Sequence, residues 1–147
     1  MNTVKELLAS KGSEVFTIAP DSTVYEALVV MDQKGVGALV VLAGGKVAGI
    51  ISERDYARKV ILKNKSSKTT SVSEIMSPLP MTVAPSRNIK ECMGLMTENH
   101  YRHLPVVDNG KLVGIVSIGD LVKAIISRQQ ALIQDLENYI AGAPEVL

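Results

Sequence analysis

Two short stretches of this sequence place an aspartate three residues after a serine. They read Gly49-Ile50-Ile51-Ser52-Glu53-Arg54-Asp55 and Gly114-Ile115-Val116-Ser117-Ile118-Gly119-Asp120. A helix that begins at the serine explains the pattern by itself, because serine caps helices and an acidic residue is favoured in the first turn. The same geometry also suits a nucleotide. Free helix N–H groups bind phosphate, and a carboxylate can accept two hydrogen bonds from a ribose diol.

Gly119 favours the nucleotide interpretation of the second stretch. An exposed glycine in the first turn of a helix costs roughly 0.5–1 kcal/mol relative to alanine. Its presence therefore indicates that another group approaches the backbone closely at this position.

Two residues that can carry positive charge, Arg102 and His103, precede a run predicted to form a buried strand. As a polar strand edge they would simply face solvent. Beside a helix N-terminus they would instead clamp a phosphate, because a guanidinium makes bidentate contacts with phosphate oxygens. Adjacent residues of a strand point to opposite faces, so we expect only one of the two to reach a given ligand.

The first stretch lacks this clamp, because Gly37 and Ala38 stand where the second has Arg102 and His103. Two arginines at the start of the following predicted helix, Arg54 and Arg58, could compensate. We therefore expect two unequal sites, with the second favoured.

The two stretches belong to a longer internal repeat. Residues 17–55 align with residues 82–120 without a gap, and 13 of the 39 positions are identical. Each copy is too small to bury a large core alone. The repeat therefore predicts two similar units that pack together with pseudo-two-fold symmetry and form a cleft.

Apolar spacing and turn residues predict the same order of elements, strand, helix, strand, strand and helix, in both copies. The first copy has a strand at 15–18, a helix that begins with a capping box at 23–26 and ends at Gly35, strands at 38–42 and 47–51, and a helix from Ser52 to about residue 63. The second has a strand at 81–84, a helix with Ile89, Cys92, Met93 and Met96 on its apolar face, strands at 103–107 and 112–116, and a helix from Ser117 that ends before Gly142 and Pro144.

Short helices at 4–11 and 72–76 precede the copies, and Asn109-Gly110 predicts a type I′ turn. This pattern predicts an α/β (α+β) fold of two tandem β-α-β-β-α repeats with an extended C-terminal helix. The predicted boundaries are a first repeat at 1–63, a linker at 64–71, a second repeat at 72–127 and a helical extension at 128–147.

Composition excludes several classes of function. The 16 Lys and Arg nearly balance the 15 Asp and Glu, which gives no general attraction to nucleic acid or membranes. Neither a catalytic Ser/His/Asp set nor a phosphate-binding P-loop is present, so we expect no enzymatic activity. The single cysteine and the absence of a signal peptide favour the cytoplasm.

Two further clusters have simpler explanations than a site. His100 and His103 with Met93 and Met96 could be imagined to bind a metal, but methionines at helical spacing favour core packing, and we predict no metal. A basic cluster favours a solvated face over RNA binding; it comprises Arg54, Arg58, Lys59, Lys63, Lys65 and Lys68.

Taken in order, these motifs make the chain resemble a CBS-domain pair, or Bateman module. The resemblance rests on the two Gly-hydrophobic-hydrophobic-Ser-x-x-Asp motifs, the two Thr-x-Ala-Pro openings at 17–20 and 82–85, and the run Arg102-His103-Leu104-Pro105-Val106-Val107. It covers residues 3–126, which is nearly the whole chain, and implies a stand-alone regulatory protein. It also implies an adenosyl ligand, with AMP favoured and ADP, ATP, NAD or S-adenosylmethionine as alternatives, in the cleft between repeats.

The resemblance assigns ligand-binding roles to residues in both copies. The favoured second site comprises Thr82, Val83, Ala84, Arg102, His103, Ile115, Ser117 and Asp120. The first site, which lacks a counterpart of Arg102, comprises Thr17, Ile18, Ala19, Ile50, Ser52, Arg54, Asp55 and Arg58. In the second site, Thr82, Val83, Ala84 and Ile115 would line the slot for adenine.

The C-terminal helix continues beyond the repeat with apolar residues on one face, including Leu132, Leu136 and Ile140. This stripe predicts a homodimer, and a regulated partner protein would then detect the ligand. The alternative is a structural dimerisation or interaction module that binds no ligand.

Overall fold

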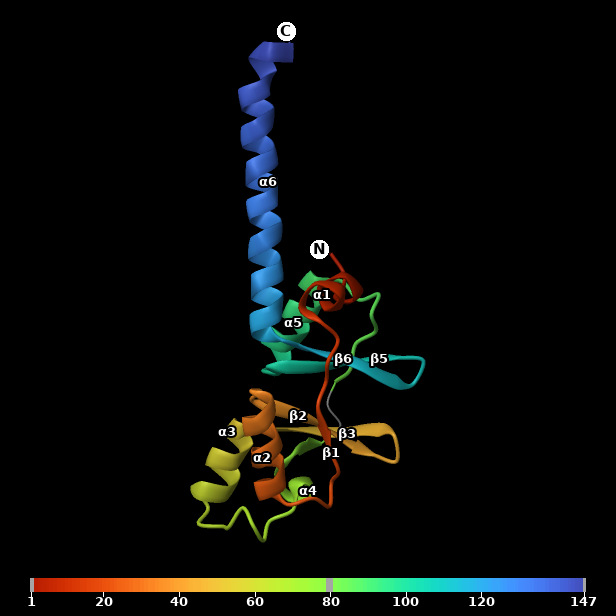
Figure 1. The fold of residues 1–147 in the computed structure, drawn as a ribbon, viewed down its shortest axis with the longest axis vertical. Coiled ribbons are helices and arrows are strands. Elements are labelled where there is room, and N and C mark those ends of the chain that lie inside the picture. The colour runs from red at the N-terminus through yellow and green to blue at the C-terminus, as the bar shows by residue number, and fades with distance from the viewer. Residues whose placement is uncertain (1, 79–80, 147) are drawn as a thin grey trace. The chain divides into compact units, whose positions relative to one another are not determined.

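The computed structural model describes residues 2–78 and 81–146 and shows a mixed fold of helices and strands (Figure 1). The first part contains α1 (Val4–Lys11), β1 (Thr17–Ile18), α2 (Val24–Lys34), β2 (Ala38–Ala43), β3 (Lys46–Ser52), α3 (Glu53–Tyr56) and the π-helical turn η1 (Ala57–Ile61). The second contains α4 (Val72–Ile75), β4 (Ser77–Pro78), α5 (Ile89–Asn99), β5 (His103–Asp108), β6 (Lys111–Ser117) and α6 (Ile118–Val146). The predicted fold class of two repeats and a long C-terminal helix is confirmed.

The chain forms two compact units, and neither unit coincides with one sequence repeat. The helical unit contains Met1–Gly12, Ala84–His103 and Val116–Leu147, and therefore α1, α5 and α6. The sheet unit contains Ser13–Val83 and Leu104–Ile115.

The short helix before each repeat is bound to the other repeat. In the helical unit, the N–H groups of Val4 and Lys5 donate to the carbonyls of Arg87 and Pro85, at 2.9 and 2.8 Å. In the sheet unit, the N–H of Val72 donates to the Ser22 carbonyl in the same way, at 2.8 Å. This exchange accounts for the places of α1 in the helical unit and of α4 in the sheet unit.

The sheet unit is built around a four-stranded sheet in the order β1-β2-β3-β4. Strand β1 runs parallel to β2, whereas the β2–β3 hairpin and the β3–β4 pair are antiparallel. One face of α2 packs on this sheet, because its apolar side chains recur at helical spacing. The buried cluster comprises Val24, Ala27, Met31, Leu39, Val41, Ile51, Val60, Val72 and Ile75.

In the helical unit, α5 packs against α6. It buries Ile89, Cys92 and Met96 as the sequence predicts, while Met93 is half-buried. Burial also raises the pKa of the Cys92 thiol, against a weaker opposing effect of Arg87, which keeps this cysteine in its neutral form.

The predicted strand at 81–84 is reduced to a single parallel bridge between Val83 and Val106. The Val83 N–H donates to the Pro105 carbonyl, and the Val107 N–H donates to the Val83 carbonyl. Extension in either direction would require an N–H from Pro105 or Pro85, which proline lacks. In the first repeat, Val40 occupies the place of Pro105, and its N–H donates to Phe16.

Two other predictions need correction, and one strand was missed. Strand β4 was not predicted, although it pairs with Gly49 and Ile50. The capping box at 23–26 shows one half only, in which the Glu26 N–H donates to Thr23 Oγ1 at 3.1 Å. Helix α6 does not end before Gly142 but continues to Val146. Glycine lowers helix propensity without forbidding a helix. Pro144 lies in the last turn, so the backbone hydrogen bond that its ring removes affects only the end of α6.

The turn predicted at Asn109-Gly110 is confirmed, because both residues have positive φ angles, 51° and 80°. Among the residues that the structure describes, none belongs to a helix with the length and apolar character needed to cross a membrane.

Candidate functional site

The second serine–aspartate motif forms the start of α6. The Ser117 N–H donates to Asp120 Oδ2 at 2.8 Å, and the Asp120 N–H donates to Ser117 Oγ at 3.1 Å. This reciprocal pair is a capping box, with aspartate in place of the usual glutamate. The structural role expected from the sequence is therefore present, and it fixes the Asp120 carboxylate at the helix start.

Arg102 lies directly beside this helix start. The Ile118 N–H, in the first turn of α6, donates to the Arg102 carbonyl at 2.9 Å. The Arg102 side chain is exposed, whereas His103, the first residue of β5, is half-buried. The backbone thus brings the predicted clamp and the predicted carboxylate to the same end of one helix.

Sequence reasoning missed Lys11, the last residue of α1. Its Nζ lies 2.7 Å from Asp120 Oδ2, and both side chains are about one quarter exposed. Burial would raise the pKa of Asp120, but the hydrogen bond from Lys11 and those from Ser117 together lower it. No spacing in the sequence links residue 11 to residue 120, because the contact depends on the exchange of α1 between repeats.

No close contact within the described residues explains why residue 119 is a glycine. A Cβ at this position would meet only Ser117 Oγ, at an ordinary distance of 3.7 Å. Within residues 2–78 and 81–146, the first-turn amides of Ile118 and Asp120 have acceptors, whereas that of Gly119 has none. Gly119 is exposed, and an N–H group without an acceptor at a helix N-terminus is a favourable donor to a phosphate oxygen.

A cavity of about 150 Å³ lies between α1 and α6 at this point. Its lining includes Lys11, Asp120 and Lys123, together with Ser10 and Ser127. Two ammonium groups and two hydroxyls around one carboxylate give the surroundings of Asp120 a positive excess.

The other residues assigned to the second site differ in accessibility. Thr82 and Ala84 are exposed, and Ile115 is half-buried in β6. Val83 is 4% exposed, and both its N–H and its carbonyl are engaged with β5. Thr82, Val83 and Ile115 belong to the sheet unit, whereas Ala84, Arg102, His103, Ser117 and Asp120 belong to the helical unit.

The first motif has the same backbone framework with different surroundings. Ser52 and Asp55 form a capping box, and the Glu53 N–H donates to the Gly37 carbonyl at 3.0 Å. Because Gly37 has no side chain, no cation occupies the place of Arg102. The Asp55 carboxylate instead pairs with Lys59 at 3.2 Å.

The remaining residues of the first site surround this framework in the sheet unit. Thr17 and Ile18 pair with β2, and Ile50 lies in β3 with only 8% of its surface exposed. The side chains of Ala19, Arg54 and Arg58 are exposed. Two exposed arginines therefore lie close in sequence to the first motif.

The half-buried His103 predicts a loss of stability on mild acidification. Burial lowers the pKa of His103 most, nearby Lys11 and Arg102 lower it further, and Asp120 opposes them. Since the unfolded chain takes up the proton first, stability falls as the pH drops below about 6.5. We expect the urea midpoint to fall between pH 7.5 and 5.5, and to fall less in His103→Gln. Equal decreases in both proteins would contradict this role.

Comparison with known proteins gives consistent matches along the chain. A family model described as the CBS domain matches residues 4–62 and again residues 72–127. The mitochondrial CBS domain-containing protein CBSX3 of Arabidopsis thaliana is 41% identical over 149 residues, covering 95% of this chain and 72% of the relative.

Two solved structures extend the comparison. A protein with CBS domains from Burkholderia ambifaria is 51% identical with a TM-score of 0.82, and the match covers 86% of this chain and 96% of that one. The crystal structure of CBSX2 in complex with AMP is 27% identical with a TM-score of 0.71, and the match covers 88% of this chain and 99% of that one.

Proposed function

The chain belongs to the CBS-domain family, and on this premise we propose that it is a non-catalytic regulatory module that binds an adenosyl nucleotide at its second motif. AMP is the favoured ligand, with ADP, ATP and NAD as alternatives. The observation that carries the proposal is the 2.9 Å hydrogen bond from the Ile118 N–H to the Arg102 carbonyl. This hydrogen bond holds Arg102 at the start of α6, where the Gly119 N–H and the Asp120 carboxylate also lie. The guanidinium and the amide are complementary to a phosphate, and the carboxylate is complementary to the ribose hydroxyls.

Each group at this helix end has a distinct role in the proposal. The Gly119 N–H and Arg102 bind the phosphate, because an exposed amide at a helix N-terminus and a guanidinium both donate to its oxygens. Asp120 accepts from the ribose hydroxyls, for which its lowered pKa keeps it ionised. The adenine contacts that the family pattern assigns to Thr82, Val83, Ala84 and Ile115 stay a prediction.

Signalling follows as a shift of population between two arrangements of the protein. A ligand changes such an equilibrium only as far as it binds one arrangement more tightly than the other. In the proposal the protein acts as a homodimer, and a partner protein detects the arrangement that the nucleotide favours. The first motif, which lacks a counterpart of Arg102, contributes an additional and weaker nucleotide site.

Calorimetric titration of the protein with AMP, and then with ADP, ATP and NAD, tests the proposal directly. We expect Arg102→Ala to weaken AMP binding about tenfold, because a charge-assisted contact with phosphate contributes about 1.5 kcal/mol. Arg58→Ala, which removes an exposed arginine beside the first motif, is the matched control and should leave the stronger site unchanged. A protein that binds none of the four nucleotides would refute the proposal.

The alternative function, a dimerisation module without a ligand, is favoured by one observation. Beyond residue 130, α6 exposes Leu132, Leu136 and Ile140 without covering them in its own chain. A protein that dimerises through α6 but gives no heat with any nucleotide would support this alternative.

A further inference from the structure

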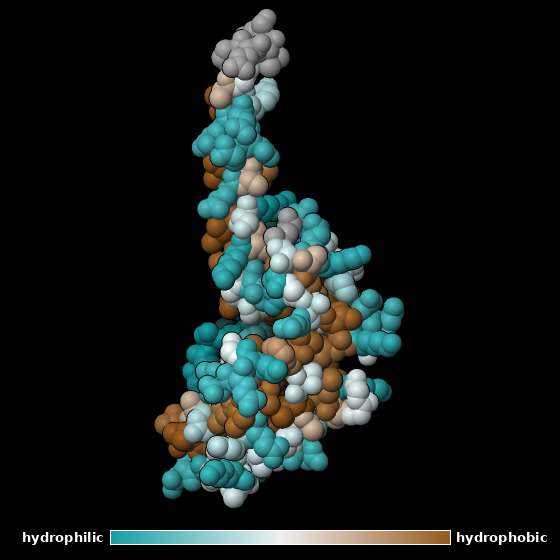
Figure 2. Space-filling view, viewed as in Figure 1, coloured by the Kyte–Doolittle hydropathy of each residue, from teal (hydrophilic) through white to brown (hydrophobic). Residues whose placement is uncertain are grey.

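Helix α6 carries an apolar stripe that its own unit leaves largely uncovered. Leu121 and Ala124 face the rest of the helical unit and are buried, whereas Val122 and Ile126 are 42% and 48% exposed. Further along, the exposed fractions rise to 53% for Leu132 and 76% for Tyr139. The helix extends past α1 and α5 (Figure 1), and Figure 2 shows hydrophobic side chains along one of its edges.

The stripe has the seven-residue period of a coiled coil. When Val122 is placed at position a, the core positions a and d are Val122, Ile125, Gln129, Leu132, Leu136 and Tyr139. Position e is isoleucine three times in succession, at residues 126, 133 and 140. Position g carries opposite charges, Arg128 and Asp135. The two flanks of the stripe therefore differ, because one is apolar and the other is charged.

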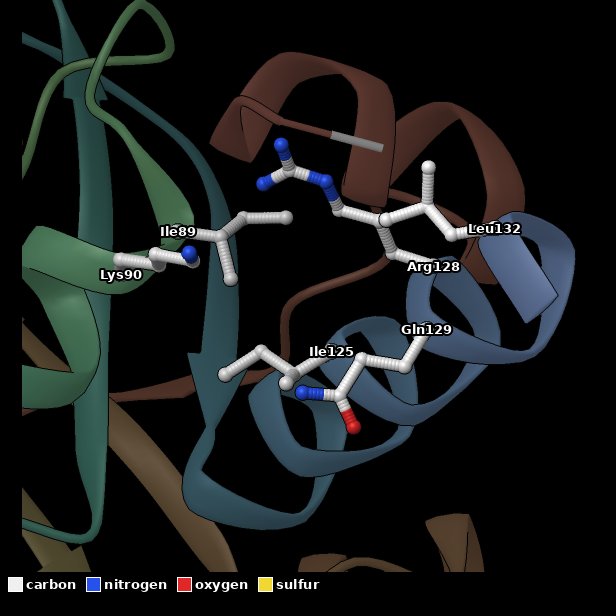
Figure 3. A pocket seen from close by; sticks show the side chains of 6 residues that line it. All are labelled: Ile89, Lys90, Ile125, Arg128, Gln129 and Leu132. Atoms are coloured by element: carbon white, nitrogen blue, oxygen red, sulfur yellow. The ribbon is translucent and has the colours of Figure 1, made fainter. Parts of the chain in front are cut away.

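A groove continues the stripe onto the body of the helical unit. The cavity has a volume of about 150 Å³ and lies between the start of α5 and α6. Figure 3 shows Ile89 and Ile125 projecting into it, with Lys90 and Arg128 at its edges and Leu132 at the end nearest the exposed part of α6. It is large enough for the end of one leucine side chain.

We propose that the stripe is covered by α6 of a second copy of this chain, arranged antiparallel. This inference deepens the homodimer of the proposed function and does not depend on nucleotide binding. Antiparallel pairing of a with d positions places Val122 opposite Tyr139, Ile125 opposite Leu136, and Gln129 opposite Leu132 of the other copy. Leu136 of the other copy then enters the groove beside Ile89.

The flanks determine the direction of pairing. Antiparallel helices bring e against e and g against g, so that Ile126 meets Ile133 of the other copy while Arg128 meets its Asp135. Parallel helices would bring g against e, which places Arg128 against Ile133 and Asp135 against Ile140. Within the described part of the chain, neither Arg128 nor Asp135 has an ion-pair partner. Only the antiparallel arrangement gives each a charge partner and groups the isoleucines.

Charge reversal in the full-length protein tests both the partner and the direction. Sedimentation equilibrium without nucleotide should show a dimer. Arg128→Glu and Asp135→Arg should each weaken it about tenfold, since each reversal turns two attractive pairs into repulsive ones. The double variant should restore the dissociation constant to within about threefold of the original. Glu137→Lys, a reversal at a position outside both flanks, is the matched control and should change little.

Several outcomes would overturn the inference. The first is a protein that sediments as a monomer, and the second is a double variant that dimerises no more tightly than the single variants. The third is a Tyr139→Cys protein in which the cysteines of the two copies form a disulfide, because such a bond requires parallel helices. AMP titration of Arg128→Glu separates this inference from the proposed function. If a monomeric variant still binds AMP, the proposed nucleotide site stands, whether or not the proposed helix pairing is correct.

Discussion

Replacing Asp120 by alanine is expected to weaken AMP binding about 100-fold, because the carboxylate would accept two charge-assisted hydrogen bonds from the ribose. The surrounding groups prepare it for this role. Lys11 and Ser117 hold the carboxylate ionised at the start of α6. Isothermal titration of the two proteins with AMP at pH 7.5 measures the effect directly.

Asp120→Ala also removes a helix cap and an ion pair, so part of any effect could come from lost stability. Asp55→Ala is the matched control, because Asp55 caps α3 in the same way and pairs with Lys59. Both variants should lose about 1 kcal/mol of stability through the cap. Only the Asp120 variant should lose affinity at the stronger site. Undiminished binding in Asp120→Ala, or an equal loss in Asp55→Ala, would rule out the assigned role.

The helices and strands could be predicted from the sequence because their signals are local and occur twice. Helix α1 begins and ends as predicted, and α2 ends at Gly35, whose φ of 66° suits glycine. The serine–aspartate motifs predicted two helix starts, and both are capped as expected. Such features depend on residues within four positions of each other, where spacing alone determines the contact.

The features that could not be predicted depend on distant segments. Lys11 reaches Asp120 only because α1 is bound to the second repeat. The shortened pairing at Val83 depends on Pro105 in another strand, and the two-residue strand β4 has no periodic pattern at all. A single sequence gives the residues of the site but not the contacts that orient them.

The glycine that opens the first motif has a structural explanation that the sequence did not reveal. Strand β4 passes over Gly49, so that a Cβ there would lie 2.6 Å from the Ser77 carbonyl oxygen and 2.7 Å from Met76 Sδ. The methionine side chain can move, but the carbonyl belongs to the backbone of β4, which pairs with β3 at this point. The motif therefore combines two functions: its glycine leaves room for β4 to pair with β3, and its serine and aspartate begin a helix.

Gly49→Ala is accordingly expected to destabilise the protein by about 2 kcal/mol, because β4 must move away from β3 or distort. Urea denaturation of the full chain measures this change. Gly94→Ala in α5 is the matched control, since a Cβ there meets nothing within 4 Å, and it should stabilise the protein by about 0.5–1 kcal/mol. AMP affinity should be unchanged in Gly49→Ala below its unfolding transition, because the proposed stronger site lies at the other motif. If Gly49→Ala were as stable as the original protein, close approach of β4 could not be the reason for glycine at this position.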